Sequence, residues 1–309
     1  MKMYYDQHWK RRLFANKMIF PLRKAWFVIS RLRIAWQRFD SPLGSSIRFI
    51  VSKGPYRVSF KDGHVYSSYN FYKFYDSRSM PNSVFEHENI RLHHADRGAC
   101  EEVFGGAYSW LPVENRTVLD IGANIGDSSV YFATRGATKI FALEVNTATY
   151  EIGKTNVRGN KLEEKIEFLN VGIGLGTVEV KAKNDYDGEF QPRHAESGTM
   201  GNVTLRSLDD VVSALGIEDA VMKIDCEGCE YSAILEAECD TLSMFSHIMG
   251  EYHYGASELI KKLNSCGFDL QFSRPSYYFD PSKENPDCLI GTFRAWRSNK
   301  SSHLSNNPK

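Results

Sequence analysis

The chain has 309 residues and no net formal charge at pH 7, with 42% hydrophobic and 25% charged residues. This composition is typical of a globular protein, and it argues against a mainly disordered, collagen-like or multi-span membrane protein. The six cysteines are too few for a secreted disulfide scaffold, so a reducing compartment is the default expectation.

Positive charge is concentrated at the N-terminus. Residues 1–39 contain ten Lys or Arg and a single acid, Asp6, whereas the rest of the chain has an equal excess of acidic residues. An acidic body makes nucleic-acid binding by that body unexpected. We therefore predict a basic arm over residues 1–44 attached to an acidic body.

The arm lacks the long apolar run of a membrane-spanning helix, because Arg31 and Arg33 interrupt it. As a helix after Pro21, it places Trp26 and Trp36 on an apolar face, with basic residues roughly opposite. Two interpretations remain open. The arm lies on an anionic membrane surface, or it packs on the body or on a second subunit. The expected location is cytoplasmic, peripheral to the membrane under the first interpretation.

Residues 45–110 are predicted to form a small, β-rich lead-in that ends in a helical segment. The residues at 61–63, Lys-Asp-Gly, are typical of a hairpin turn. Residues 84–109 are expected to be helical and to lead into the main body. The expected strands are Ile47–Val51, Tyr56–Phe60 and His64–Ser67.

From Arg116 onward, strand-like and helix-like segments alternate, which is typical of a parallel sheet covered by helices on both faces. We therefore predict an α/β, Rossmann-like, seven-stranded domain over residues 111–297, followed by a disordered tail at 298–309. Segment 183–202 is expected to be a mobile excursion. The expected strands are Thr117–Ile121, Lys139–Glu144, Ile166–Val171, Ala220–Asp225, His247–Tyr252, Phe268–Arg274 and Leu289–Trp296. The expected helices lie near 127–135, 147–159, 207–215, 229–238 and 256–266.

A glycine-bearing turn follows the first strand of this domain. Gly122 and Gly126 allow a tight turn and a close approach of the backbone to a ligand. A dinucleotide fingerprint needs further glycines where Asn124 and Asp127 stand, which argues against a nicotinamide-dependent oxidoreductase. The acid Asp120 suits a cationic ligand, such as the amine of S-adenosylmethionine, held directly or through water.

A second acid, Glu144, ends the next strand 24 positions after Asp120. An acid at this place is positioned to accept hydrogen bonds from both ribose hydroxyls of a nucleoside. A loop acid that caps the following helix is the alternative. We group Asn146, two residues further on, with Asp120, Gly122, Asn124, Gly126 and Glu144 as the expected S-adenosylmethionine-binding residues.

The region from about 116 to 252 resembles the class I S-adenosylmethionine-dependent methyltransferases, and more narrowly the FkbM family. The resemblance is carried by the strings at Val118–Gly126, Thr204–Asp210 and Met222–Glu230. The third string is the most specific, because it matches the family's Lys-Ile-Asp-x-Glu-Gly-x-Glu pattern. The resemblance covers about half of the chain and implies methyl transfer, usually to oxygen and often on glycans or polyketides.

The acceptor side is expected where the fourth and fifth strands end, beside each other. Lys223 and Asp225 share a strand face, and a buried lysine needs acidic partners, for which we expect Asp225, Glu227 and Glu251. Asp225 and His253 are the expected base and orienter for the acceptor proton. Glu227 or Glu251 is expected to hold the lysine or the acceptor.

Two alternatives for this group remain open. Asp225, Glu251 and His253 together suit a divalent cation such as Mg or Mn, although a metal is not the favoured interpretation. The same residues also suit a purely structural network of ion pairs. The Cys226-x-x-Cys229 spacing is typical of a zinc half-site or a redox pair, but with no second such pair in the sequence we interpret it as coincidental.

Together these patterns predict an S-adenosylmethionine-dependent O-methyltransferase acting on a hydroxyl of a glycan, glycolipid or related metabolite. A non-catalytic, membrane-docked scaffold with the same fold is the main alternative. The acceptor and the oligomeric state stay open.

Overall fold

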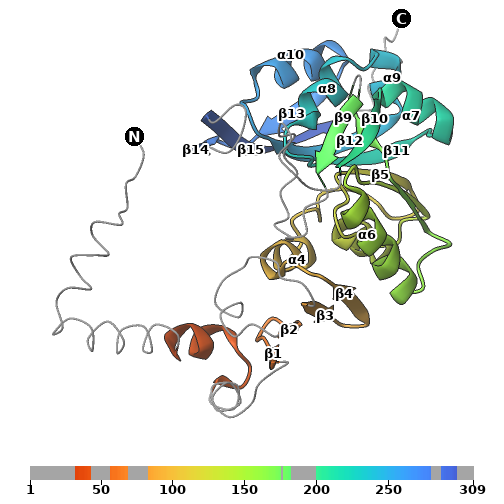
Figure 1. Ribbon diagram of the computed structural model, residues 1–309. Helices are drawn as coiled ribbons and strands as arrows, with labels where there is room; N and C mark the ends of the chain where they lie inside the picture. Colours follow the sequence, from red (N-terminus) through yellow and green to blue (C-terminus); the bar gives the residue numbers. More distant parts are fainter. Residues whose placement is uncertain are drawn as a thin grey trace, which may run out of the picture.

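The computed structural model describes residues 32–42, 56–68, 83–174, 177–181, 200–279 and 287–297 (Figure 1). The predicted strand at Ile47–Val51, most of the arm and the predicted tail at 298–309 lie outside the described residues.

A mixed sheet with the strand order β13-β15-β12-β11-β5-β6-β7 forms the body, and β14 pairs with β15. The central strands β12, β11, β5, β6 and β7 are parallel to one another, whereas β15 runs antiparallel to its neighbours. The strands are β5 (Thr117–Ile121), β6 (Lys139–Leu143), β7 (Ile166–Leu169), β11 (Ala220–Ile224), β12 (Phe245–Tyr252), β13 (Asp269–Phe272), β14 (Ser276–Phe279) and β15 (Asp287–Trp296). The predicted Rossmann-like α/β sheet is confirmed, with β14 as an addition.

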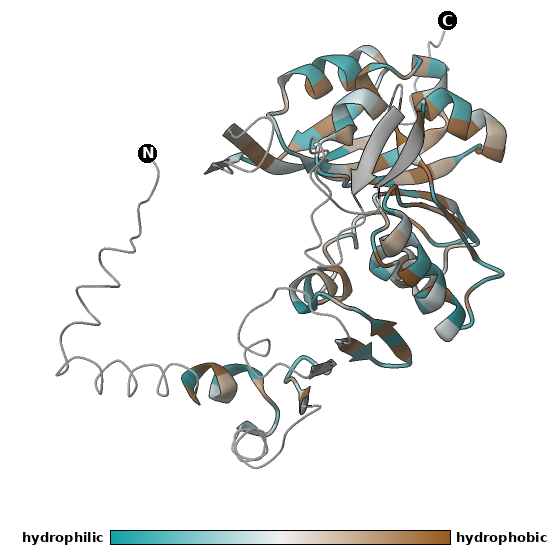
Figure 2. Cartoon of the chain, in the orientation of Figure 1, coloured by the Kyte–Doolittle hydropathy of each residue, from teal (hydrophilic) through white to brown (hydrophobic). Residues whose placement is uncertain are grey.

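Helices cover both faces of this sheet, because alternate strand residues point to opposite sides. Val118 packs in one apolar cluster with residues of α5 and α6, and Leu119 packs in the other with residues of the later helices. The first two helices are α5 (Asp127–Thr134) and α6 (Thr147–Gly159). The others are α7 (Leu208–Leu215), α8 (Cys229–Leu235), α9 (Cys239–Ser243) and α10 (Ser257–Ser265), of which α9 is not expected from the sequence. Figure 2 shows brown central strands and helices that alternate between teal and brown.

Ahead of this body lies a four-stranded antiparallel layer and one helix. They are β1 (Tyr56–Ser59), β2 (Val65–Ser68), β3 (Val84–His87), β4 (Ile90–His93) and α4 (Arg97–Phe104). The predicted hairpin around residues 61–63 is confirmed. The helix predicted from residue 84 is wrong until Arg97: Phe85 and Leu92 face a buried core from two paired strands, and Glu88 takes a positive φ in the turn between them.

Asn156 of α6 connects this layer to the sheet. Its side chain accepts a hydrogen bond from the backbone of His93 at 2.8 Å and donates to the carbonyls of His93 and Ile125. Ile125 belongs to the glycine-bearing turn. A single buried amide therefore holds the N-terminal layer, α6 and that turn in one arrangement.

A separate three-stranded sheet lies between β7 and α7, in the order β8-β10-β9. Its strands are β8 (Gly172–Ile173), β9 (Thr177–Lys181) and β10 (Met200–Arg206). The predicted excursion at 183–202 is therefore wrong at its end, where Met200 already pairs with Lys181. Residues 183–199 lie outside the described residues.

The described end of the arm packs on the N-terminal layer. Residues 32–38 are helical, and Ala35 and Phe39 are fully buried in the same apolar cluster as β1 to β4. Trp36 points outward and is 62% exposed. Among the described residues, no helix is long and apolar enough to cross a membrane.

Candidate functional site

The glycine-bearing turn brings β5 against the end of β11. Gly122 and Gly126 have positive φ angles of 74° and 87°. A Cβ atom on Gly122 would lie 1.9 Å from the carbonyl oxygen of Asp225, so no side chain fits there. Asn124 also has a positive φ, of 48°. The turn therefore places its backbone directly beside the loop that carries the expected acceptor-side residues.

Glu144 closes this turn from the neighbouring strand end. Its carboxylate accepts hydrogen bonds from the backbone N–H groups of Asn124, at 3.0 Å, and Asn146, at 2.7 Å. Burial raises the pKa of Glu144 to about 7, and the two N–H groups partly oppose that rise. The expected nucleoside acid thus lies in contact with the glycine-bearing turn. Its ribose-binding role stays a prediction.

Asn146 has a structural task that its sequence position signals. Its side chain accepts hydrogen bonds from the backbone N–H groups of Ala148 and Thr149, and so caps α6. Asparagine is among the preferred residues at this position of a helix. A contact between Asn146 and the cofactor stays a prediction, and it would have to use atoms other than the side-chain oxygen that caps the helix.

Asp120 and Lys223 form a buried ion pair 3.2 Å apart. The parallel register of β5 and β11 sets Asp120 directly beside Lys223. Lys223 also donates to the carbonyls of Ile121 and Gly122. Its ion pair is thus with Asp120, which is not among the expected partners Asp225, Glu227 and Glu251. Burial lowers the pKa of Lys223, but the charges of Asp120 and then Asp225 raise it, so Asp225 is an electrostatic partner at longer range. The sequence-based expectation compared residues along one strand and missed the neighbour across the sheet.

This pair also changes the expectation for Asp120. Its side chain is fully buried, and its second oxygen accepts hydrogen bonds from the hydroxyls of Ser128 and Ser129 at 2.6 Å each. A contact between Asp120 and a cofactor amine, direct or through water, stays a prediction. In the structure, Asp120 fixes Lys223 and the start of α5.

The acceptor-side residues gather around the imidazole of His253, as the parallel pairing of β11 and β12 predicts. His253 is 1% exposed. Its Nε2 atom lies 3.4 Å from Glu227 Oε2 and 3.8 Å from Glu251 Oε2, and its Nδ1 atom lies 3.0 Å from Glu230 Oε1. Asp225 offers a carboxylate oxygen to the same group. We call these five residues the His253 cluster.

Charge and burial shift the pKa values in this cluster. Burial alone would lower the pKa of His253, but the surrounding carboxylates, above all Glu230, raise it to about 9. Burial together with Asp225 raises the pKa of Glu251 to about 7. Burial also raises the pKa of Asp225, opposed mainly by Lys223. The cluster therefore disfavours having all its carboxylates ionised together.

Two members of this neighbourhood are not expected from the sequence reasoning. The hydroxyl of Tyr108 donates to Asp225 Oδ2 at 3.3 Å. Glu230 is fully buried, and its Oε1 accepts from the backbone N–H of Cys226 at 3.2 Å. Glu230 ends the most specific family string, which is a signal that could have found it. Nothing in the sequence around Tyr108 points to the loop after β11.

The cysteine interpretation needs correction. Cys226 and Cys229 are bonded to each other within the loop that carries Asp225 and Glu227, so their spacing is not coincidental. A second disulfide joins Cys239 to Cys266, away from this loop. Disulfides persist mainly in oxidising compartments, so both bonds weigh against the expectation of a reducing one.

The strand order and the strand-end site define a class I, Rossmann-like methyltransferase fold. Residues 120–270 match the family model described as "Methyltransferase FkbM domain". These residues, just under half of the chain, therefore contain an FkbM-type methyltransferase domain.

Other similarities are more distant. The chain is 34% identical over 73 residues to protein arginine N-methyltransferase 6 of Danio rerio, which is 24% of this chain and spans a fifth of that protein's length (20%). A putative RNA methyltransferase from Pyrococcus horikoshii is 12% identical, with a TM-score of 0.39 over 67% of this chain and 85% of that one. A precorrin-6y C5,15-methyltransferase from Geobacter metallireducens is also 12% identical, with a TM-score of 0.38 over 66% and 90%. At such low TM-scores the two structural likenesses carry no weight of their own.

Proposed function

We propose that this protein uses S-adenosylmethionine to methylate a hydroxyl group, and that its acceptor is a glycan, glycolipid or related metabolite. The observation that carries the proposal is the contact between Glu144 and the glycine-bearing turn at Asn124. This contact brings together the turn whose backbone can approach a ligand closely and the acid expected to bind the ribose, at adjacent ends of β5 and β6. The FkbM domain match supports methyl transfer as the reaction.

The cofactor lies, in this proposal, across the ends of β5 and β6. Each oxygen of the Glu144 carboxylate accepts one backbone hydrogen bond and keeps a further lone pair for a ribose hydroxyl. Gly122 and Gly126 keep the turn free of side chains where the cofactor passes. The reactive sulfonium then faces the end of β11, where the loop with Asp225 begins.

The acceptor lies against the His253 cluster. The methyl group passes from the sulfonium sulfur to the acceptor oxygen: the S–C bond breaks as the C–O bond forms, and the hydroxyl proton leaves to a carboxylate or to water. The sulfonium is already activated, so the protein must mainly align the two reactants and assist the proton. In this proposal Asp225 and His253 take or orient the hydroxyl proton, and Glu227 or Glu251 holds the acceptor.

Cofactor binding is tested by calorimetry on the full chain with S-adenosylmethionine and, separately, with NAD. We expect binding of S-adenosylmethionine and of its demethylated product, and none of NAD. Glu144→Ala should weaken both ligands at least tenfold, because it removes the ribose acceptor. Glu151→Ala on the exposed surface of α6 is the matched control and should bind normally. No binding by the folded wild type would instead favour a scaffold role.

We also propose that the basic arm binds an anionic membrane surface. Residues 1–39 are strongly basic, and Trp36 stays exposed although Ala35 and Phe39 pack inward. Each basic residue near an anionic surface contributes about 1 kcal/mol, screened by salt. The full chain should sediment with phosphatidylserine vesicles at low salt and dissociate as salt rises.

A substitution separates this membrane contact from simple charge attraction. Trp36→Ser should reduce vesicle binding, whereas Tyr277→Ser, at an aromatic residue of similar exposure, should not. Equal sedimentation of the two variants and the wild type would count against Trp36 as a membrane contact.

A further inference from the structure

We propose, resting on the function above, that the His253 cluster binds one divalent metal ion of the Mg²⁺ or Mn²⁺ class through Asp225, Glu251 and His253. One ligand atom from each residue lies within 4.8 Å of the other two. Opposite ligands of a six-coordinate Mg²⁺ are about 4.2 Å apart. Small rotations of the two carboxylates therefore close the set around an ion.

The imidazole is oriented for this task. Its Nδ1 atom faces the buried Glu230, which leaves Nε2 as the atom directed at the carboxylates of Glu227 and Glu251. A metal-binding histidine usually gives its other ring nitrogen to a carboxylate, which fixes the ring and its tautomer. Glu230 Oε1 also accepts from the backbone N–H of Cys226, which holds this carboxylate beside the ring, and its Oε2 is buried without a hydrogen-bond partner among the described residues.

Charge argues for a cation rather than for a closed ion-pair network. One imidazole faces carboxylates from Asp225, Glu230 and Glu251. The nearby cation Lys223 makes its ion pair with Asp120 and donates to carbonyls at the end of β5. The cluster thus has more acidic than basic groups, and a divalent ion would remove that imbalance.

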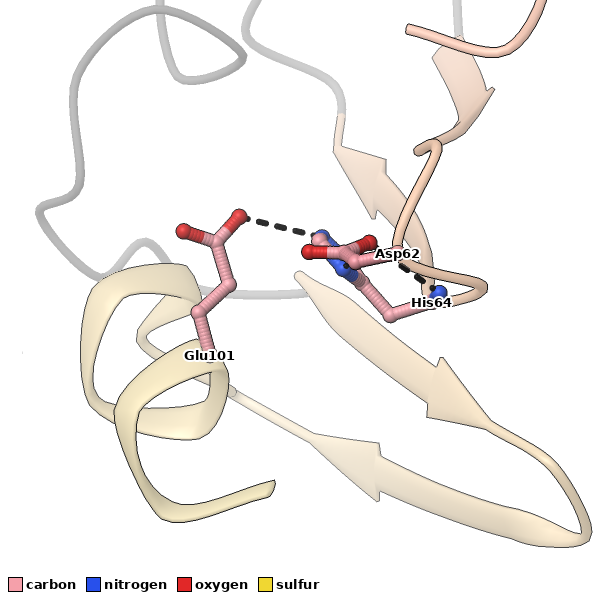
Figure 3. A group of neighbouring side chains, drawn as sticks. All are labelled: Asp62, His64 and Glu101. Atoms are coloured by element: carbon pink, nitrogen blue, oxygen red, sulfur yellow. Dashed lines mark hydrogen bonds and ion pairs between the residues drawn. The ribbon is translucent and has the colours of Figure 1, made fainter. Parts of the chain in front are cut away.

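A second group with similar residues shows what a neutralised cluster looks like. Asp62, His64 and Glu101 also lie within reach of one ion, with His64 between the two acids (Figure 3). Here Glu101 pairs with the guanidinium groups of Arg38 and Arg97. Because the carboxylate of Glu101 is already paired with two arginine cations, we assign no metal to this group.

A metal at the His253 cluster would contribute to the proposed reaction on the acceptor side. It would bind the acceptor oxygen, fix its position before the sulfonium and lower the pKa of its hydroxyl. Asp225 and His253 would then act as ligands rather than as base and orienter.

The test is Mn²⁺ binding to the full chain without cofactor. Binding is detected as the loss of the free Mn²⁺ signal in electron paramagnetic resonance. We expect one site in the wild type and at least a tenfold weaker one in Glu251→Gln and in Asp225→Asn. Asp62→Asn, in the neutralised group, should bind Mn²⁺ as the wild type does. S-adenosylmethionine affinity, measured on the same samples, should stay normal and report an intact fold.

Several outcomes would overturn the assignment. They are no Mn²⁺ binding by folded wild type, unchanged binding in both variants, and loss of binding in Asp62→Asn. Because cofactor affinity is read separately, a failed metal site with normal cofactor binding leaves the methyltransferase proposal standing. Lost cofactor binding with normal Mn²⁺ binding would contradict the methyltransferase proposal and leave the metal site standing.

Discussion

His64 and His253 are both buried and both lie among carboxylates, yet their surroundings differ in charge balance and in position. The group around His64 includes two arginines that pair with Glu101. The cluster around His253 has carboxylates from two strand ends and no arginine ion pair is seen with it in the described part of the chain. The first arrangement contains arginine counter-charges, whereas the second is the one to which we assign a cation.

Their positions agree with this difference. The His64 group joins three segments of the N-terminal layer: Arg38 from the arm, the β1–β2 turn, and α4. The His253 cluster lies where β11 and β12 end, the edge at which open α/β sheets bind their ligands. Counter-charge and strand topology, rather than residue type, are therefore our grounds for treating only the second group as a candidate site.

A large expected effect on stability follows from removing the counter-charge of the His64 group. Arg97→Met deletes a guanidinium whose side chain is 3% exposed and leaves Glu101 underpaired. Breaking such a buried pair costs about 3 kcal/mol of unfolding free energy. Urea unfolding monitored by circular dichroism checks this value. A loss below about 0.5 kcal/mol would contradict the structural assignment, and Arg91→Met, at a largely exposed arginine, is the control.

The largest expected effect on turnover follows from Asp225. Asp225→Asn keeps the shape and removes the charge, so we expect near-normal cofactor affinity and turnover lowered about 100-fold or more. Turnover is measured on the acceptor as release of the demethylated cofactor, with Asp62→Asn as the matched control. Normal turnover by the folded Asp225→Asn variant would remove the His253 cluster from the reaction.

Much of this fold follows from local patterns in the sequence. The strand at Thr117–Ile121 is found with its bounds, because five apolar-rich residues before a glycine turn allow few alternatives. The helix at residues 147–159 is likewise found in full, between its asparagine cap and its basic last turn. Residues 84–93 are the main error, since their short alternation indicates a strand pair only once the partner strand β2 is known.

Some contacts of the candidate site could likewise be predicted from the sequence, and others could not. Asp225 and His253 come together as predicted, because the order of parallel strands fixes which ends are adjacent. The partner of Lys223 depends on register across the sheet, and Tyr108 reaches Asp225 from a segment 117 residues away in sequence. The first contact depends on strand register and the second on tertiary packing, and local periodicity in the sequence specifies neither.

The two disulfides offer a way to separate stability from site geometry. The Cys239–Cys266 bond closes 27 residues of chain, and the Cys226–Cys229 bond closes three. The first should contribute about 3 kcal/mol to the unfolding free energy and the second about half of that. Replacing both cysteines of each pair by serine, one pair at a time, measures these values by denaturant unfolding.

Turnover should respond in the opposite order. The Cys226–Cys229 bond holds Glu227, which has a φ of 59°, in the loop of the His253 cluster, so its double serine variant should lose several-fold in turnover. The Cys239→Ser/Cys266→Ser variant should retain turnover below its unfolding temperature. Equal activity of the two variants would show that the loop keeps its geometry without the bond.

The smallest expected effect is a pH dependence of cofactor affinity from Glu144. Its pKa of about 7 arises from burial, partly offset by backbone N–H groups, with Lys223 lowering it further and Asp120 raising it. In the proposed complex the ionised carboxylate accepts both ribose hydroxyls, so affinity for S-adenosylmethionine should fall as pH decreases from about 8 to about 6, by up to about tenfold.

Folding stability should depend on pH in the opposite direction to cofactor affinity. The folded state binds the Glu144 proton more tightly than the unfolded state, so this group's stabilising contribution is present at low pH and is lost as pH rises through about 7. Calorimetry across this range should show affinity and stability changing in opposite directions in the wild type, and a flatter affinity profile in Glu144→Gln. Asp127, with a pKa raised by burial to about 6, titrates nearby, so Asp127→Asn must retain the wild-type affinity profile. If the affinity profile flattens in Asp127→Asn instead, the pH dependence arises from Asp127 at the start of α5 and not from Glu144.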